Sequence, residues 1–137
     1  NVALGTDGAA SNNDQDMLAE MRTAALLAKG VSGNASAVSA MQALKMATIN
    51  GARALGLDDE IGSLSIGKAA DIVAIDLSEV ETQPVFNPLA QIVYAASRHQ
   101  VSDVWIAGKR VLNKRQLTTL DLNELRQRTA VWQRRLG

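Results

Sequence analysis

The stretch Asn1-Val2-Ala3-Leu4-Gly5-Thr6-Asp7-Gly8 sets the fold expected for this chain. A short apolar run is followed at once by two glycines that bracket an acid, a pattern typical of a buried strand that ends in a turn. Glycine lets the backbone turn sharply. Asp7 is therefore expected just past the carboxyl end of a strand, where barrel and open α/β folds carry their chemistry. Alternatively, Asp7 caps the next helix or fills the turn.

Composition narrows the class of protein. The chain has 137 residues, of which 47% are hydrophobic and only 3% aromatic, so a single aliphatic core is expected. Fourteen basic and fourteen acidic residues balance, which gives no overall basic field for nucleic acid. The absence of cysteine excludes disulfides and thiolate metal sites.

Location and completeness can also be predicted. No apolar run approaches the ~20 residues that cross a bilayer, and no signal peptide is visible, so a cytoplasmic protein without membrane contact is expected. The first residue is not Met and the chain opens inside the expected strand. We therefore expect a piece of a longer protein.

Apolar periodicity predicts helices in the first half of the chain. The first spans about residues 14–29, with an apolar stripe that we expect to be core. The expected N-cap is Ser11, Asn12 or Asn13. The apolar stripe consists of Met17, Leu18, Met21, Ala25 and Ala28. A second helix is expected to start at Ser36 or Ser39, and a third to run from Ile49 to Leu55 between Thr48 and Gly56.

The second half of the chain carries strand signals. Residues 72–75 form a nearly continuous β-branched run, which predicts a buried strand. Residues 101–107 and 110–112 predict a hairpin at the surface, with Gly108 at the first central position of a type II′ turn. A short helix is expected over residues 89–96.

The last element is a helix from Asp121 to the end, with Asp121 and Glu124 at the spacing of a capping box. Along one face of this helix lie Leu122, Leu125, Thr129, Trp132 and Leu136. The basic residues are expected to form a solvated face in preference to a nucleic-acid site; they are Arg126, Arg128, Arg134 and Arg135. His99, the single histidine, lies between Arg98 and Gln100 and is expected to be an exposed loop residue.

Two motifs resemble a known family. Residues 4–13 read Leu-Gly-Thr-Asp-Gly-Ala-Ala-Ser-Asn-Asn, and residues 47–56 read Ala-Thr-Ile-Asn-Gly-Ala-Arg-Ala-Leu-Gly ahead of an expected hairpin over residues 61–71. In this order they resemble the C-terminal third of the metal-dependent amidohydrolases, in the aminohydrolase branch. Within it they are similar to the 5-methylthioadenosine/S-adenosylhomocysteine deaminase group.

The resemblance implies an α/β fold, the C-terminal fragment of a (β/α)₈ TIM-type barrel. Residues 1–56 would be the last barrel strand and its helices, residues 57–120 the C-terminal part of a small β-sandwich domain, and residues 121–137 a C-terminal helix. Asp7 would be the family's metal-binding, proton-accepting aspartate, the catalytic and metal residue of a site holding one zinc ion. The family's histidines and glutamate lie upstream and have no counterpart here.

The activity implied by the resemblance is deamination of an adenosine-type nucleoside by metal-activated water. The chain alone is expected to bind no zinc and to be inactive, because a catalytic zinc needs about three protein ligands. Another aminohydrolase, of guanine, cytosine or triazine type, and a non-catalytic scaffold fragment stay open. We also expect the apolar positions Val2–Leu4, Met17, Leu18, Met21 and Ile72–Ile75 to be covered by the missing N-terminal polypeptide or by a second copy of the chain.

Overall fold

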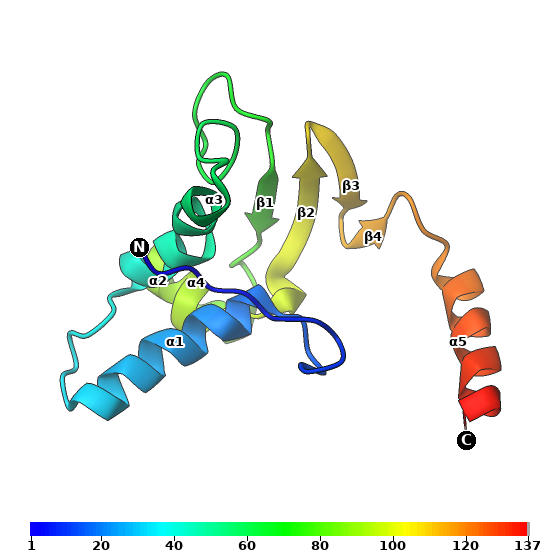
Figure 1. The fold of residues 1–137 in the computed structure, drawn as a ribbon, viewed down its shortest axis with the longest axis horizontal. Coiled ribbons are helices and arrows are strands. Elements are labelled where there is room, and N and C mark those ends of the chain that lie inside the picture. Colours follow the sequence, from blue (N-terminus) through cyan, green and yellow to red (C-terminus); the bar gives the residue numbers. More distant parts are fainter. Residues whose placement is uncertain (137) are drawn as a thin grey trace.

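The computed structural model describes residues 1–136 as a mixed α/β arrangement in which the larger helices of the first part pack together and a small sheet extends beside them (Figure 1). In chain order the elements are α1 (Met17–Ser32), α2 (Ala40–Ala47), α3 (Ile49–Leu55), β1 (Ile72–Ile75), η1 (Val80–Thr82), α4 (Pro88–Tyr94), η2 (Arg98–Gln100), β2 (Val101–Ile106), β3 (Lys109–Asn113), β4 (Gln116–Leu117) and α5 (Leu122–Leu136).

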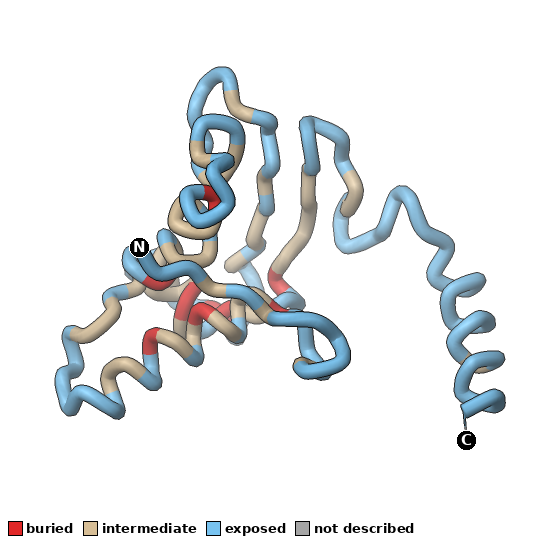
Figure 2. Tube along the Cα trace, viewed as in Figure 1, coloured by how far each residue is buried: buried red, intermediate tan, exposed pale blue. Residues whose placement is uncertain are grey.

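The core lies where α1, α2 and α4 meet. Met21 and Ala25 of α1, Ala43 of α2 and Val93 of α4 are buried against one another. Small residues on α1 and α2 let the helix backbones approach closely, and the buried positions in Figure 2 gather in this region. The prediction that the stripe of α1 is core is therefore confirmed for Met21 and Ala25, with Leu18 packed partly buried against them. The expectation that Met21 needs other polypeptide to cover it is wrong, because this chain buries it to 3% exposure.

Helix α1 begins later than predicted. Its N-cap is Asp16, whose Oδ1 accepts from the amides of Leu18 and Ala19 at 2.9 and 3.2 Å. The helix ends at Ser32, later than the predicted end near residue 29, and Gly33 is its C-cap with a left-handed φ of 62°. The three residues predicted as caps instead build the loop before the helix.

Helices α2 and α3 begin and end as predicted. Ser39 caps α2 in a capping box with Gln42. Thr48 precedes α3, but its hydroxyl donates to the carbonyl of Leu44 at 2.7 Å and makes no cap hydrogen bond. Gly56 ends α3 with a φ of 69°.

The four strands form one antiparallel sheet in the order β1-β2-β3-β4. The predicted strand at residues 72–75 is present, but Val73 is 56% exposed because only part of the sheet is covered within this chain. The surface hairpin is confirmed, with Ile106 paired to Lys109. Its turn type is corrected: both central residues, Ala107 and Gly108, have positive φ, which defines a type I′ turn.

Residues 2–4 form no strand within this chain, contrary to prediction. A strand requires a neighbouring strand to pair with. Among residues 1–136, the backbone pairing of this segment is a single hydrogen bond from the amide of Leu4 to the carbonyl of Met46 at 3.0 Å. Residues 61–71 likewise form turns and no hairpin. Lys68 holds them instead, since its Nζ donates to the carbonyls of Ile61, at 3.0 Å, and Asp58.

Helix α5 stands away from the other elements (Figure 1), and none of its described residues is buried. Asp121 caps it, accepting from the amides of Asn123 and Glu124. The arginine face is solvated as predicted, with Arg128 paired to Glu124 at 2.6 Å. Among the described residues, no helix has both the length and the apolar character needed to span a membrane.

Candidate active site

Asp7 lies at the end of an extended segment that is fastened to the helices. Besides the Leu4 contact with α2, the Asn50 side chain of α3 donates from Nδ2 to the carbonyl of Val2 at 2.9 Å, and Asn1 donates to the carbonyl of Asn50 at 2.9 Å. These contacts fix the direction in which the chain enters the loop at residues 5–16.

The carboxylate of Asp7 is exposed and held in one orientation. Its Oδ1 accepts from the amide of Gly8 at 2.7 Å, and its Oδ2 accepts from the hydroxyl of Ser11 at 2.6 Å. The backbone of Asp7 has a φ of 59°, which is uncommon outside glycine. Uncommon backbone geometry of this kind concentrates at functional sites.

These hydrogen bonds also set the charge of the site. The hydroxyl of Ser11 first, and the amide of Gly8 second, lower the pKa of Asp7 below its usual value because both stabilise the ionised form. The carboxylate is therefore negative at neutral pH. It can bind a cation or accept a proton from a nearby donor.

Asn12 closes the loop that follows Asp7. Its Nδ2 donates to the carbonyl of Thr6 at 2.8 Å and to Oε1 of Glu20 at 3.1 Å, and its Oδ1 accepts from the amide of Asp14 at 3.0 Å. Sequence reasoning assigned Ser11 and Asn12 to helix capping and missed this role. The sequence did contain a signal for it: the run Ser11-Asn12-Asn13-Asp14 holds more cap-forming residues than one helix start uses, so some of them are free to stabilise the loop.

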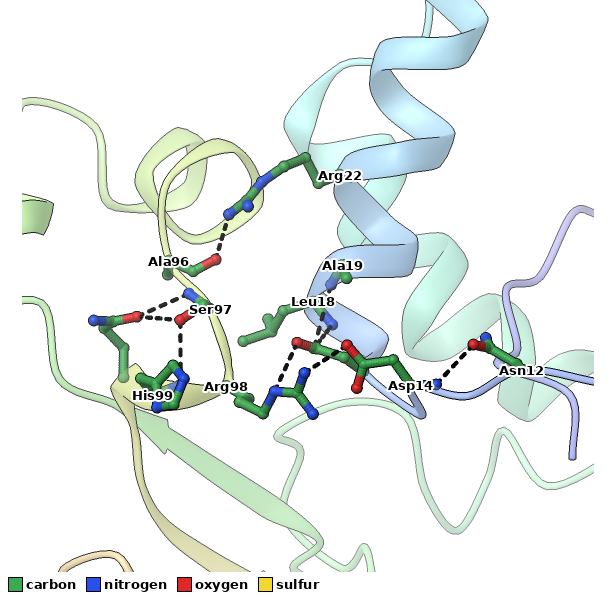
Figure 3. A network of polar contacts seen from close by, with 11 residues as sticks. Asn12, Asp14, Leu18, Ala19, Arg22, Ala96, Ser97, Arg98 and His99 are labelled. Carbon is green, nitrogen blue, oxygen red and sulfur yellow. Dashed lines mark hydrogen bonds and ion pairs between the residues drawn. The ribbon is translucent and has the colours of Figure 1, made fainter. Parts of the chain in front are cut away.

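Arg98 reaches the same loop from η2. Its Nη2 lies 2.5 Å from Oδ2 of Asp14, and its Nε lies 3.6 Å from Oδ2 of Asp16 (Figure 3). Arg22 lies nearby on α1 and donates to the carbonyl of Val93 at 3.3 Å and to that of Ala96. His99 is exposed, as predicted, and its backbone amide donates to the hydroxyl of Ser97 at 3.3 Å.

The residues described here do not form a zinc site by themselves. Within residues 1–136, no group of three or more histidine, cysteine, aspartate or glutamate side chains could hold a metal ion. A catalytic zinc takes about three protein ligands. The chain therefore offers Asp7 as a single candidate ligand, and any further ligands must come from other polypeptide.

Proteins of similar sequence include deaminases. The chain is 53% identical over all 137 residues to a 5-methylthioadenosine/S-adenosylhomocysteine deaminase of Teredinibacter turnerae, covering 31% of that protein. It is 51% identical over 125 residues, 91% of the chain, to a protein of the same name from Moorella thermoacetica, covering 29% of it. The chain thus spans less than a third of the length of these relatives.

Solved structures agree with this comparison. A zinc-bound adenosine deaminase from Xanthomonas campestris superimposes with a TM-score of 0.93 at 54% identity, over 97% of this chain and 30% of that one. The zinc complex of an atrazine chlorohydrolase from Arthrobacter aurescens superimposes with a TM-score of 0.83 at 29% identity, over 90% of this chain and 28% of that one.

A family model decides the assignment. The model described as the amidohydrolase family matches residues 1–111, which include Asp7, the helical core and most of the sheet. The motifs at residues 4–13 and 47–56 both lie inside this match. The chain therefore belongs to the amidohydrolase family.

Proposed function

We propose that this chain forms the C-terminal part of a zinc-dependent hydrolase that deaminates 5-methylthioadenosine or S-adenosylhomocysteine. The observation that carries the proposal is the Asp7 carboxylate: it is exposed, ionised and held by two hydrogen bonds. The chain that carries this carboxylate is 53% identical along its whole length to a deaminase of this name.

In the complete enzyme, Asp7 would supply one metal ligand and the proton acceptor of the site. A bound zinc ion makes hydroxide available near neutral pH. Asp7 can orient the attacking water and accept its proton, because a general base must lie within hydrogen-bond reach of the proton it removes. Hydrogen bonds from Gly8 and Ser11 keep the carboxylate in one rotamer. The reaction therefore loses little entropy in orienting the Asp7 side chain.

The same proposal accounts for the surfaces left open in this chain. Val2–Leu4 would become the last strand of a (β/α)₈ barrel once a neighbouring strand is present, and residues 1–56 would be the end of that barrel. Residues 57–120 would belong to the β-sandwich domain, which would cover exposed positions such as Val73. Residues 121–137 would be a C-terminal helix.

Two observations keep other functions in view. The TM-score of 0.83 with an atrazine chlorohydrolase supports another aminohydrolase, acting on a triazine, guanine or cytosine ring. The single candidate ligand among the described residues supports a non-catalytic fragment for the isolated chain.

An assay of the complete protein would decide between these functions. Purified protein loaded with zinc would be incubated with 5-methylthioadenosine, S-adenosylhomocysteine, guanine, cytosine and a triazine, and ammonia or chloride release would be followed. We expect ammonia from the first two. Turnover of only the other substrates would replace the proposed substrate class, and no turnover of any would remove the proposal. The isolated 137-residue chain, measured in parallel, is expected to hold no stoichiometric zinc and to be inactive.

A further inference from the structure

We propose that Arg98 is a positioning residue for Asp7: its guanidinium holds the loop that carries Asp7 in the geometry the reaction needs. The kinetic part of this inference rests on the proposed function, but the structural part does not. Arg98 touches neither Asp7 nor a candidate substrate, so its effect must pass through other residues.

The link begins at an ion pair between segments far apart in the sequence. Arg98 and Asp14 are separated by 84 positions, yet Nη2 of Arg98 lies 2.5 Å from Oδ2 of Asp14 (Figure 3). The same guanidinium faces Oδ2 of Asp16 at 3.6 Å, and Asp16 is buried at the start of α1. One cation therefore pairs with two neighbouring carboxylates and offsets the repulsion between them.

Hydrogen bonds continue the link to the reacting residue. The amide of Asp14 donates to Oδ1 of Asn12 at 3.0 Å, and Nδ2 of Asn12 donates to the carbonyl of Thr6 at 2.8 Å. That carbonyl belongs to the peptide group that joins Thr6 to Asp7. The position of Arg98 is thus connected, contact by contact, to the backbone of Asp7.

The short helix η2 that carries Arg98 is itself held in place. Ser97 and Gln100 form a capping box around η2, and Gln100 is buried. Arg22 ties the preceding segment to α1 through the carbonyls of Val93 and Ala96. An arginine on such a fixed helix can restrain a loop, whereas a mobile surface arginine contributes little.

The physical consequence is pre-organisation. The loop at residues 5–16 is largely exposed, and its own hydrogen bonds compete with water. Residues that orient a metal-binding or catalytic group from behind typically change activity or metal affinity by roughly 10–100-fold when removed. We therefore expect Arg98→Gln to lower kcat by an amount in that range.

The kinetic test uses three variants of the zinc-loaded complete enzyme. Arg98→Gln is expected to lower kcat by roughly 10–100-fold with KM changed by less than about threefold, because the substrate is still bound but Asp7 is less well placed. Arg98→Lys keeps one cation and should recover part of the loss. Arg53→Gln is the matched control, since Arg53 is equally exposed and pairs with Asp58 at 3.7 Å away from Asp7; it should leave kcat within about twofold.

A second measurement is independent of activity. The amides of Gly8, Ser11 and Asn12 are hydrogen-bonded in this loop, so their hydrogen exchange reports its opening. Exchange should be roughly three- to tenfold faster in Arg98→Gln than in the wild type and unchanged in Arg53→Gln. Asp14→Asn, which breaks the pair from the other side, should give the same increase.

The outcomes separate this inference from the proposed function. A wild type that is inactive on every substrate removes the proposed function, and the exchange rates then decide alone whether Arg98 holds the loop. An active wild type with an Arg98→Gln variant of normal kcat overturns the positioning role. Equal exchange in Arg98→Gln and wild type overturns it as well, even if the variant melts at a lower temperature.

Discussion

The backbone amide of Lys114 donates to Oδ1 of Asp103 at 2.9 Å, which fastens the β3–β4 turn onto β2. The same oxygen accepts a hydrogen bond from Nε of Arg110. The Cζ atom of Arg110 lies 5.2 Å from the centre of the Trp105 ring. The Asp103 side chain of β2 is therefore joined both to β3 and to the β3–β4 turn, although sequence analysis assigned it no role.

The stability of this part of the sheet should depend on acid. The amide of Lys114 first, and Arg110 second, lower the pKa of Asp103 from 3.8 to about 2. Since the folded-state pKa lies below the unfolded one, the contribution is complete above about pH 4 and is lost as the pH falls through about 2. Melting temperatures of the complete protein at pH 7, 4, 3 and 2 would show this.

Asp103→Asn is the comparison for that experiment. It should lower the melting temperature at pH 7 and reduce the further loss between pH 4 and pH 2, because one shifted carboxylate is absent. An equal loss over this pH interval in variant and wild type would contradict the prediction.

The β3–β4 turn offers a stabilising substitution. Lys114 and Arg115 both have positive φ, 45° and 64°, between the paired residues Asn113 and Gln116. Such turns favour glycine at the second central position, and a left-handed conformation costs other residues about 1–2 kcal/mol. Arg115→Gly should therefore raise the free energy of unfolding by up to about 1 kcal/mol after the entropy of glycine is counted.

Lys109→Gly is the matched control for the turn. Lys109 is exposed in β3 and is not among the residues with positive φ, so glycine there should destabilise the protein by roughly 0.5–1 kcal/mol. Denaturant titrations of both variants would test the contrast. A destabilising Arg115→Gly would show that its side chain matters more than its backbone conformation.

Gly62 is expected to be intolerant of any side chain. A Cβ at this position would lie 2.8 Å from Cβ of Ala52 and 2.9 Å from Cα of Ile49, and the backbone has a φ of 84°. Gly67 has a similar φ of 93° with no atom within 4 Å. Gly62→Ala should therefore lower the free energy of unfolding by about 1–3 kcal/mol more than Gly67→Ala does, because only the first substitution overpacks against α3. Equal melting temperatures for the two variants would contradict the close contact.

Asp7 itself gives the most direct prediction about activity. In the complete enzyme, Asp7→Ala should abolish turnover while the melting temperature changes little, because the side chain is exposed. Asp59→Ala, an exposed aspartate in the turn after α3, is the control and should keep normal turnover. Near-normal turnover in Asp7→Ala would remove the proposed role of this residue.

Much of the fold could be predicted because its determinants are local. Ser39 and Asp121 mark helix starts through side-chain hydrogen bonds to backbone amides, and Gly56 ends α3 with a left-handed backbone. The hairpin of β2 and β3 follows from alternation around Gly108. These signals act within a few residues, so the sequence alone contains them.

The errors arose where the outcome depends on distant partners. The run Ser11-Asn12-Asn13 offered several N-caps, and tertiary contacts with Thr6 and Glu20 gave the role to Asp16. Residues 2–4 have strand character but lack a neighbouring strand within this chain. Asp7 was predicted as a site residue because glycines bracket it and a family motif surrounds it, and that assignment stays a prediction. Arg98 was missed because its partner lies 84 positions away.

The left-handed backbone of Asp7 makes selection for thermal stability and selection for activity act differently on this position. Asparagine adopts a φ near 59° more readily than most residues and keeps the acceptor for the amide of Gly8. A library screened only for heat resistance should therefore tolerate Asp7→Asn, a neutral amide in place of the anion, better than most other substitutions at this position. Engineering of this chain for thermal robustness should hold position 7 constant, since a substitution that the left-handed backbone accepts still removes the charge that the loop presents.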